Sequence, residues 1–175
     1  MTTYAELVTQ IRDYSETDSA VLTTTIINDI IANAEDRIFR SVELDCFKEY
    51  INGNTAANNR FVSLPGQTTA ASTPTISDIA TIRYVTIYTD SGTKERFALE
   101  RVDADFLNEY YPTPETGSSA KPRYYATWDM GTIAIAPTPN AVYKFEIGIT
   151  KKPTGLSSSN TTTWVSVNAE RALLY

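Results

Sequence analysis

The sequence contains no histidine and only one cysteine among its 175 residues. Without histidine the chain cannot use a Ser-His-Asp triad, a Cys-His pair or imidazole ligands for a metal. A single cysteine excludes an internal disulfide and a structural zinc site, and it is consistent with a cytoplasmic protein. We expect this residue, Cys46, to be buried or half-buried, because it lies between Leu44 and Phe47.

Other common signals of function are missing as well. The sequence has no Walker loop, no dinucleotide-binding glycine motif and no nucleophile elbow. It has no apolar run long enough for a membrane span, and residues 2–13 are too polar for a signal peptide. The net charge of −6 argues against a nucleic-acid clamp, which needs clustered Lys and Arg. An acidic surface suits DNA that slides past without sticking, but it is equally that of an ordinary soluble protein.

Carboxylates are the remaining candidates for chemistry, and the densest group is Asp103, Asp105 and Glu109. A calcium loop needs a glycine hinge and regularly spaced oxygen ligands, which this group lacks. A glycosidase needs two carboxylates facing each other across a cleft, which a sequence cannot show. Acidic residues are typical of first helical turns, so we interpret the group as a helix cap and solvated surface. We therefore predict no enzyme activity, no metal site and no cofactor.

A long amphipathic helix is the clearest element of the sequence, over residues 22–42. Its apolar residues recur at steps of three and four, which is the helical period. They are Ile26, Ile27, Ile30, Ile31, Ala34, Ile38 and Phe39. Such a broad apolar stripe must be buried against other elements.

A shorter helix precedes it. Thr3 and Glu6 have the spacing of a capping box, and an amphipathic segment follows as far as Tyr14. Because the connection to residues 22–42 is short, we predict an antiparallel helical hairpin over residues 1–44.

The middle of the chain has the two-residue period of β-strands. We expect three hairpins: residues 47–51 with 60–64, 79–88 with 94–99, and 122–128 with 132–136. Residues 142–150 alternate most clearly, with Tyr143, Phe145, Ile147 and Ile149 on one face. Three polar segments rich in Ser and Thr are expected to be loops: residues 65–78, 113–121 and 153–163.

Two further helices are expected, at residues 100–111, where Asp103 is a plausible cap, and at residues 168–175. The predicted fold class is therefore α+β, with a small helical bundle packed with an antiparallel β-sandwich or barrel-like sheet. We predict a single domain over residues 1–175. Residues 45–163 would form a β-rich body with a short helix near 103–111, and residues 164–175 would start a C-terminal helix.

Aromatic residues are frequent, with eleven tyrosines and two tryptophans. Tyr124 and Trp128 share one face of an expected strand, and Tyr125 lies on the other. Aromatic residues on strands most often belong to a core or a protein interface. An alternative is a carbohydrate- or receptor-binding module of a phage tail component, which would bind glycans through Tyr124, Tyr125 or Trp128.

Several stretches resemble the head–tail adaptor (connector) proteins of tailed bacteriophages, particularly of the short-tailed (podovirus) type. TYAELVTQIRDYSE and LTTTIINDIIANAEDRIFRSVELD resemble the opening pair of helices of that family. ERVDADFLNEYYP resembles its mid-chain helix. PRYYATWD, TIAIAPTPN and YKFEIGITKKPTGLS resemble its central hairpins, and TTTWVSVNAERALLY resembles the start of its C-terminal helical segment.

The resemblance implies a structural virion protein at the head–tail interface, assembled in the host cytoplasm. Copies would form a homo-oligomeric ring, dodecameric in that family, beneath the portal protein. The ring would extend the DNA channel, let genomic DNA pass without sequence-specific binding, and give a tail or nozzle protein its docking surface. No membrane is involved. Related chains usually continue beyond the position of Tyr175.

The resemblance also implies two sets of contact residues. The expected portal interface consists of Trp164, Asn168, Arg171, Leu173, Leu174 and Tyr175. The expected tail-facing loops contain Gln67, Thr73, Thr113, Glu115, Ser118 and Lys121. Ring contacts should join the helical hairpin of one subunit to sheet edges of the next.

Overall fold

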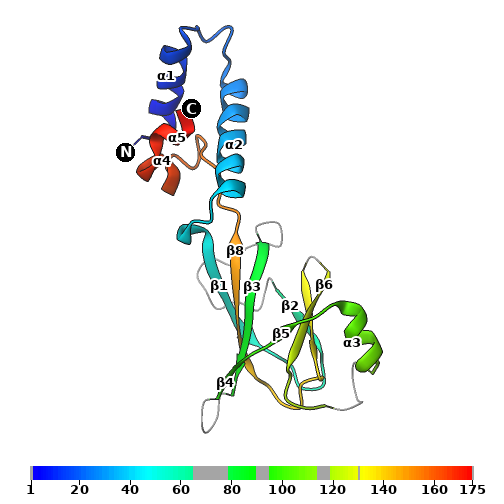
Figure 1. Ribbon diagram of the computed structural model, residues 1–175. Coiled ribbons are helices and arrows are strands. Elements are labelled where there is room, and N and C mark those ends of the chain that lie inside the picture. The colour runs from blue at the N-terminus through cyan, green and yellow to red at the C-terminus, as the bar shows by residue number, and fades with distance from the viewer. Residues whose placement is uncertain (1, 65–78, 90–94, 114–118, 130, 175) are drawn as a thin grey trace. The chain divides into compact units, whose positions relative to one another are not determined.

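The structure is a computed structural model that describes residues 2–64, 79–89, 95–113, 119–129 and 131–174 (Figure 1). The chain divides into two compact units, Met1–Phe47 with Lys152–Tyr175 and Lys48–Lys151. We call them the helical unit and the β unit. The predicted α+β class is confirmed, because helices make up the first unit and two sheets dominate the second. The single domain over the whole chain stays a prediction.

The helical unit begins with two antiparallel helices, α1 (Tyr4–Ser15) and α2 (Thr24–Ser41) (Figure 1). The predicted capping box is present, with Thr3 and Glu6 each bonded to the other's backbone N–H. Thr23 caps α2 through its side chain. The Tyr4 hydroxyl donates a hydrogen bond to Asn28 Oδ1 over 2.6 Å, which joins the two helices directly.

The apolar stripe of α2 is only partly buried, in contrast to the expectation. Ile27 and Ile31 are fully buried, whereas Ile26 and Ile30 are 44% and 43% exposed. The neighbouring elements of this unit pack on the Ile27 side, where one cluster forms the core. Its buried members are Leu7, Val8, Ile27, Ile31, Leu156, Val165 and Leu173. The seven apolar positions of α2 thus divide into a core face and an exposed face.

The C-terminal region forms two short helices, α4 (Trp164–Asn168) and α5 (Glu170–Leu174), where the sequence predicted one. Ala169 separates them with a non-helical backbone, and its N–H closes α4 on the Val165 carbonyl. Neither helix is long enough to be stable alone. Buried Val165 and Leu173 attach them to the core of the helical unit.

Cys46 is exposed, so the prediction that it is buried is wrong. It lies in a short 3-10 helix, η1 (Asp45–Phe47), which turns Phe47 inward instead. The Phe47 ring is buried and meets the Phe39 ring edge-to-face, with the centroids 5.1 Å apart. Of the two apolar neighbours that suggested burial of Cys46, Phe47 is therefore buried without it, and Leu44 is half-buried.

The β unit is a sandwich of two four-stranded sheets (Figure 1). The first sheet has the order β1-β8-β3-β4 and the second has the order β2-β7-β6-β5. The strands are β1 (Lys48–Asn54), β2 (Phe61–Ser63), β3 (Ile79–Tyr88), β4 (Arg96–Ala98), β5 (Glu100–Arg101), β6 (Tyr124–Asp129), β7 (Thr132–Ala136) and β8 (Lys144–Lys151). Side chains from both sheets form one buried cluster between them.

Strand β8 lies between β1 and β3 at the centre of the first sheet. Its predicted alternation is confirmed, since Phe145, Ile147 and Ile149 are each at most 1% exposed and face the opposite sheet. The predicted hairpins β3–β4 and β6–β7 are also confirmed by their antiparallel pairing.

The predicted hairpin of residues 47–51 with 60–64 is wrong. Strand β1 pairs with β8, and β2 pairs with β7 in the other sheet. The connection between them crosses from one sheet to the other and is fixed at its start. The Thr55 N–H donates to the Tyr143 carbonyl over 2.8 Å, and Thr55 Oγ1 accepts from the Tyr143 N–H over 2.9 Å. Ile51 and Val62 face the shared core from opposite sheets, so both keep the alternation that suggested a hairpin.

Helix α3 (Ala104–Tyr110) is shorter than the predicted helix at residues 100–111, because Glu100–Arg101 form β5 parallel to β6. Leu107 is fully buried in a cluster with small residues of the second sheet. These are Ala126, Ala134 and Ala136. The alanines let the helix approach the outer face of that sheet closely.

Gly148 gives a direct test of the packing of the first sheet. The Tyr84 ring crosses its strand partner Gly148 so closely that a Cβ there would lie 2.1 Å from the ring. The Gly148→Ala substitution should therefore displace the ring and cost about 1–3 kcal/mol of unfolding free energy. Urea denaturation followed by tryptophan fluorescence measures this loss. In a Tyr84→Ala background the same substitution should cost much less, and an equal cost in both backgrounds would contradict the contact.

Candidate interaction surfaces

The acidic group on α3 is not arranged as a chemical site. Asp103, Asp105 and Glu109 are all exposed. Asp103 occupies the N-cap position, but its side chain makes no capping hydrogen bond, so that part of the prediction is wrong. Within the described ranges no group of three or more His, Cys, Asp or Glu side chains could hold a metal ion. No helix of the described residues is long and apolar enough to cross a membrane.

Glu35 of α2 fixes the segment that leads into α4. Its Oε2 accepts a hydrogen bond from the Leu156 N–H over 2.8 Å, and its Oε1 accepts one from Thr163 Oγ1 over 3.3 Å. Thr163 is also the N-cap of α4. The approach at Gly155 is close, because a Cβ there would lie 2.9 Å from Glu35 Oε2. One carboxylate thus holds both ends of residues 155–163 on α2.

The next residue, Asp36, adds a second attachment of this segment. Lys152 Nζ lies 3.2 Å from Asp36 Oδ1, and Arg40 Nη2 lies 2.8 Å from Asp36 Oδ2. The hydrogen bond from Lys152 is the main cause that lowers the pKa of Asp36, and the positive charge of Arg40 adds to it. The segment predicted as a loop at residues 153–163 is therefore bonded to α2 at several points. Inside it, Asn160 Nδ2 donates to the carbonyls of Thr154 and Gly155.

The residues predicted to contact a portal have different surroundings. Trp164 is 47% exposed, and Asn168 and Arg171 are also exposed. Leu173 is 3% exposed in the core of the helical unit, and Leu174 is partly buried against the same core. Tyr175 lies outside the described residues. Trp164, Asn168 and Arg171 are thus the members of the set that are free to meet a partner without repacking.

The residues predicted to face a tail are mostly outside the described part of the chain. This holds for Gln67, Thr73, Glu115 and Ser118. Thr113 is described and exposed. Lys121 Nζ lies 3.0 Å from Glu95 Oε2 and 3.6 Å from the centroid of the Phe97 ring. Lys121 therefore fixes the end of this segment to the β4 side of the β unit.

The aromatic residues of β6 do not form a continuous platform. Tyr125 is 3% exposed in the core between the sheets. Tyr124 is partly covered by the Phe106 ring of α3, with centroids 5.5 Å apart. Trp128 is 40% exposed and meets the Phe61 ring edge-to-face at 5.4 Å. Of the three residues of the carbohydrate-binding alternative, Trp128 is exposed, Tyr124 is half-buried and Tyr125 is buried.

Two exposed apolar surfaces were not identified in advance. One is the pair Ile26 and Ile30 on α2, which we call the α2 stripe. The other is the pair Phe61 and Trp128 on the second sheet, which we call the aromatic pair. The sequence does carry a signal for the α2 stripe, because seven apolar positions are more than a single buried face of the helix accommodates. The aromatic pair had no such signal, because Phe61 and Trp128 are far apart in the sequence.

Comparison with known protein families gives a match for this chain. Residues 2–175, almost the whole chain, match the family model described as SU10 adaptor protein. The class is therefore that of a bacteriophage head–tail adaptor, a structural component of the virion that contacts other phage structural proteins. The chain belongs to the SU10 adaptor protein family. A comparison with curated proteins gives no match. The short-tailed type stays a prediction.

The role of Glu35 can be tested by hydrogen exchange. The Glu35→Ala substitution leaves the Leu156 N–H without its acceptor and should cost about 1–3 kcal/mol of local stability. The Leu156 amide should then exchange much faster, and α4 and α5 should exchange faster with it. Asp29→Ala is a matched control, because Asp29 is an exposed carboxylate on the same helix. Equal exchange of Leu156 in both variants would show that Glu35 does not hold the segment.

Proposed function

We propose that twelve copies of this chain form a ring beneath the portal, extend the DNA channel and provide the docking surface for the tail. The observation that carries the proposal is the family match over residues 2–175, which makes the chain a phage adaptor. The ring, its stoichiometry and its neighbours are the parts that we add. Three features of the structure support them.

The first feature is the pair of unlike apolar surfaces. A head-to-tail ring needs two different surfaces, one on each side of every subunit. The α2 stripe is aliphatic and belongs to the helical unit, whereas the aromatic pair belongs to the β unit. Isolated exposed apolar residues are ordinary, but neighbouring ones are typical of protein interfaces. This assignment keeps the expected contact of the helical hairpin of one subunit with a sheet of the next.

The second feature is the exposed part of the terminal helices. Trp164 and Arg171 are residue types that often anchor protein interfaces. The core contacts of Val165 and Leu173 hold their helices in place, so the exposed side chains are presented on a folded support. We assign Trp164, Asn168 and Arg171 to the portal contact. Leu173, Leu174 and Tyr175 remain in the proposed interface only if the helices rearrange or extend on binding.

The third feature is charge. The net charge of −6 favours a surface along which DNA passes without strong phosphate binding. Residues 65–78 and 113–121 contain two carboxylates, Asp78 and Glu115, and one lysine, Lys121, and are otherwise uncharged. We assign these two segments to the tail-facing side.

The portal contact is tested by the mass of the complex with the portal protein of the same genome. We expect one adaptor per portal subunit. Trp164→Glu should weaken this binding about tenfold or more, because it buries a carboxylate where an aromatic anchor was. Val142→Glu is the matched control, since Val142 is 59% exposed in the β unit. Failure of the unmodified chain to bind an intact portal, also when extended past Tyr175, would contradict the proposal.

The tail-facing assignment is tested by a deletion of residues 113–121. The deleted chain should still form the complex of the same mass with the portal, but particles that carry it should not attach tails. Sedimentation of the assembled particles with tail protein measures this. A deletion that prevents the ring itself would show that this segment belongs to the subunit contact.

A further inference from the structure

The β sandwich leaves two strand edges open along part of their length within the described ranges. Strand β4 pairs only with residues 86–88 of β3, so residues 79–84 of β3 have β8 on one side and no described strand on the other. Strand β5 pairs only with Tyr124 and Tyr125 of β6, so residues 127–129 of β6 have β7 alone. An open strand edge presents N–H and C=O groups that can pair with another extended chain.

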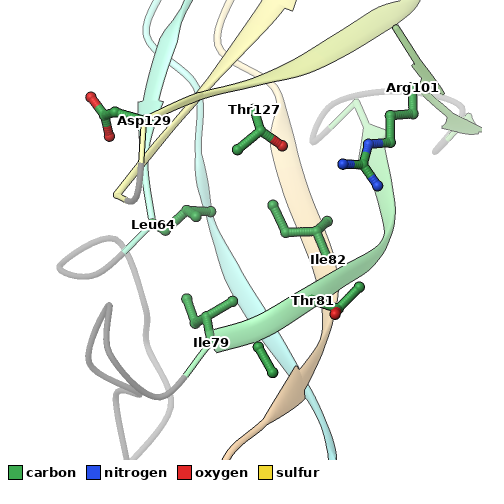
Figure 2. Close-up of a pocket in the computed structure, with 8 residues that line it drawn as sticks. Leu64, Ile79, Thr81, Ile82, Arg101, Thr127 and Asp129 are labelled. Carbon is green, nitrogen blue, oxygen red and sulfur yellow. The ribbon is translucent and has the colours of Figure 1, made fainter. Parts of the chain in front are cut away.

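Both open edges border one groove of about 430 Å³ (Figure 2). Residues 79–82 of β3 line one side, and Thr127 and Asp129 of β6 line the other. Its apolar surface comes mainly from the half-buried Ile79 and Ile82, because Leu64 also lines the groove but is only 2% exposed. The groove therefore combines an apolar floor with open backbone edges.

Two side chains of opposite charge, Arg101 and Asp129, line the groove. Figure 2 shows Arg101 reaching from β5 toward Ile82 and Thr81, and Asp129 on the side of Leu64. The Arg101 guanidinium has no hydrogen bond or ion pair with any described residue. The Asp129 carboxylate accepts the Gly131 N–H over 2.8 Å. The Arg101 end of the groove thus carries a cation that has no partner among the described residues.

We propose that this groove binds an extended segment of another virion protein, which adds as a strand to the open edge of β3. Main-chain hydrogen bonds to residues 79–84 supply the pairing, and alternate apolar side chains of the segment cover Ile79 and Ile82. A carboxylate of the segment pairs with Arg101. The proposal rests on membership of the adaptor family, which gives the chain virion partners, and does not depend on the ring.

The register shifts of β3 suggest an alternative, in which the open edge is protected from pairing with another chain. Its pairing with β8 is irregular between Ile79 and Thr81 and between Ile82 and Tyr84, and such bulges often protect edges from pairing. A protected edge, however, needs neither an apolar groove beside it nor an arginine that lacks a partner among the described residues. The two features together favour a peptide ligand with one acidic residue.

The experiment uses overlapping synthetic peptides that tile every structural protein of the same phage genome, including this chain. Binding to the purified full chain is measured by fluorescence anisotropy. We expect one or more peptides of another virion protein to bind, and Arg101→Glu to weaken them about tenfold or more. Arg123→Glu should leave the affinity unchanged, because Arg123 is exposed outside the groove. Hydrogen exchange of residues 79–84 should slow on binding, while that of Ile87 stays the same.

Several results would overturn the proposal. One is the absence of any peptide whose affinity depends on Arg101. Another is binding by peptides of this chain alone, which would make the groove a contact between copies. A third is binding that appears only after residues 66–77 are replaced by a Gly/Ser linker, which would show that the chain fills its own groove. Because Arg101→Glu should still join the portal complex, loss of that complex would be a failure of the ring proposal instead.

Discussion

The contact between the two sheets of the β unit is the interaction on which most of the structure depends. Strand β8 contributes Phe145, Ile147 and Ile149 to it, all at most 1% exposed. Burial of each such side chain stabilises the fold by about 1.5–3 kcal/mol. Because β8 also pairs with β1 and β3, it aligns strands that are distant in the sequence. The groove and the aromatic pair both lie on the sandwich that this contact holds together.

The sequence predicts those elements whose pattern is local. The capping box at Thr3, the bounds of β3 and the alternation of β8 all follow from spacing within one segment, and the structure has them. The pairing of β1 with β8 could not be predicted in this way. Its strands are separated by about half the chain, and the alternation of Ile51 is compatible with any partner that faces the same core.

The interaction surfaces were predictable only in part, for a related reason. The exposure of a side chain depends on which elements pack beside it. The sequence does not show that α1, α4 and α5 contribute to one core with Ile27 and Ile31, whereas Ile26 and Ile30 stay exposed. Because a helix was predicted from residue 100, strand β5 was not recognised. The open edge of β6 and the position of Arg101 were therefore not predicted either. The family resemblance, in contrast, was carried by stretches throughout the chain, and the match over residues 2–175 confirms it.

We propose that surfaces presented by the two small cores of this chain join its copies into a ring at the head–tail interface. A cryo-electron microscopy reconstruction of the intact virion tests this claim most directly. We predict density for the β unit in twelve copies directly beneath the portal, around the DNA channel. Density for this chain in a peripheral tail component, with none beneath the portal, would contradict the claim.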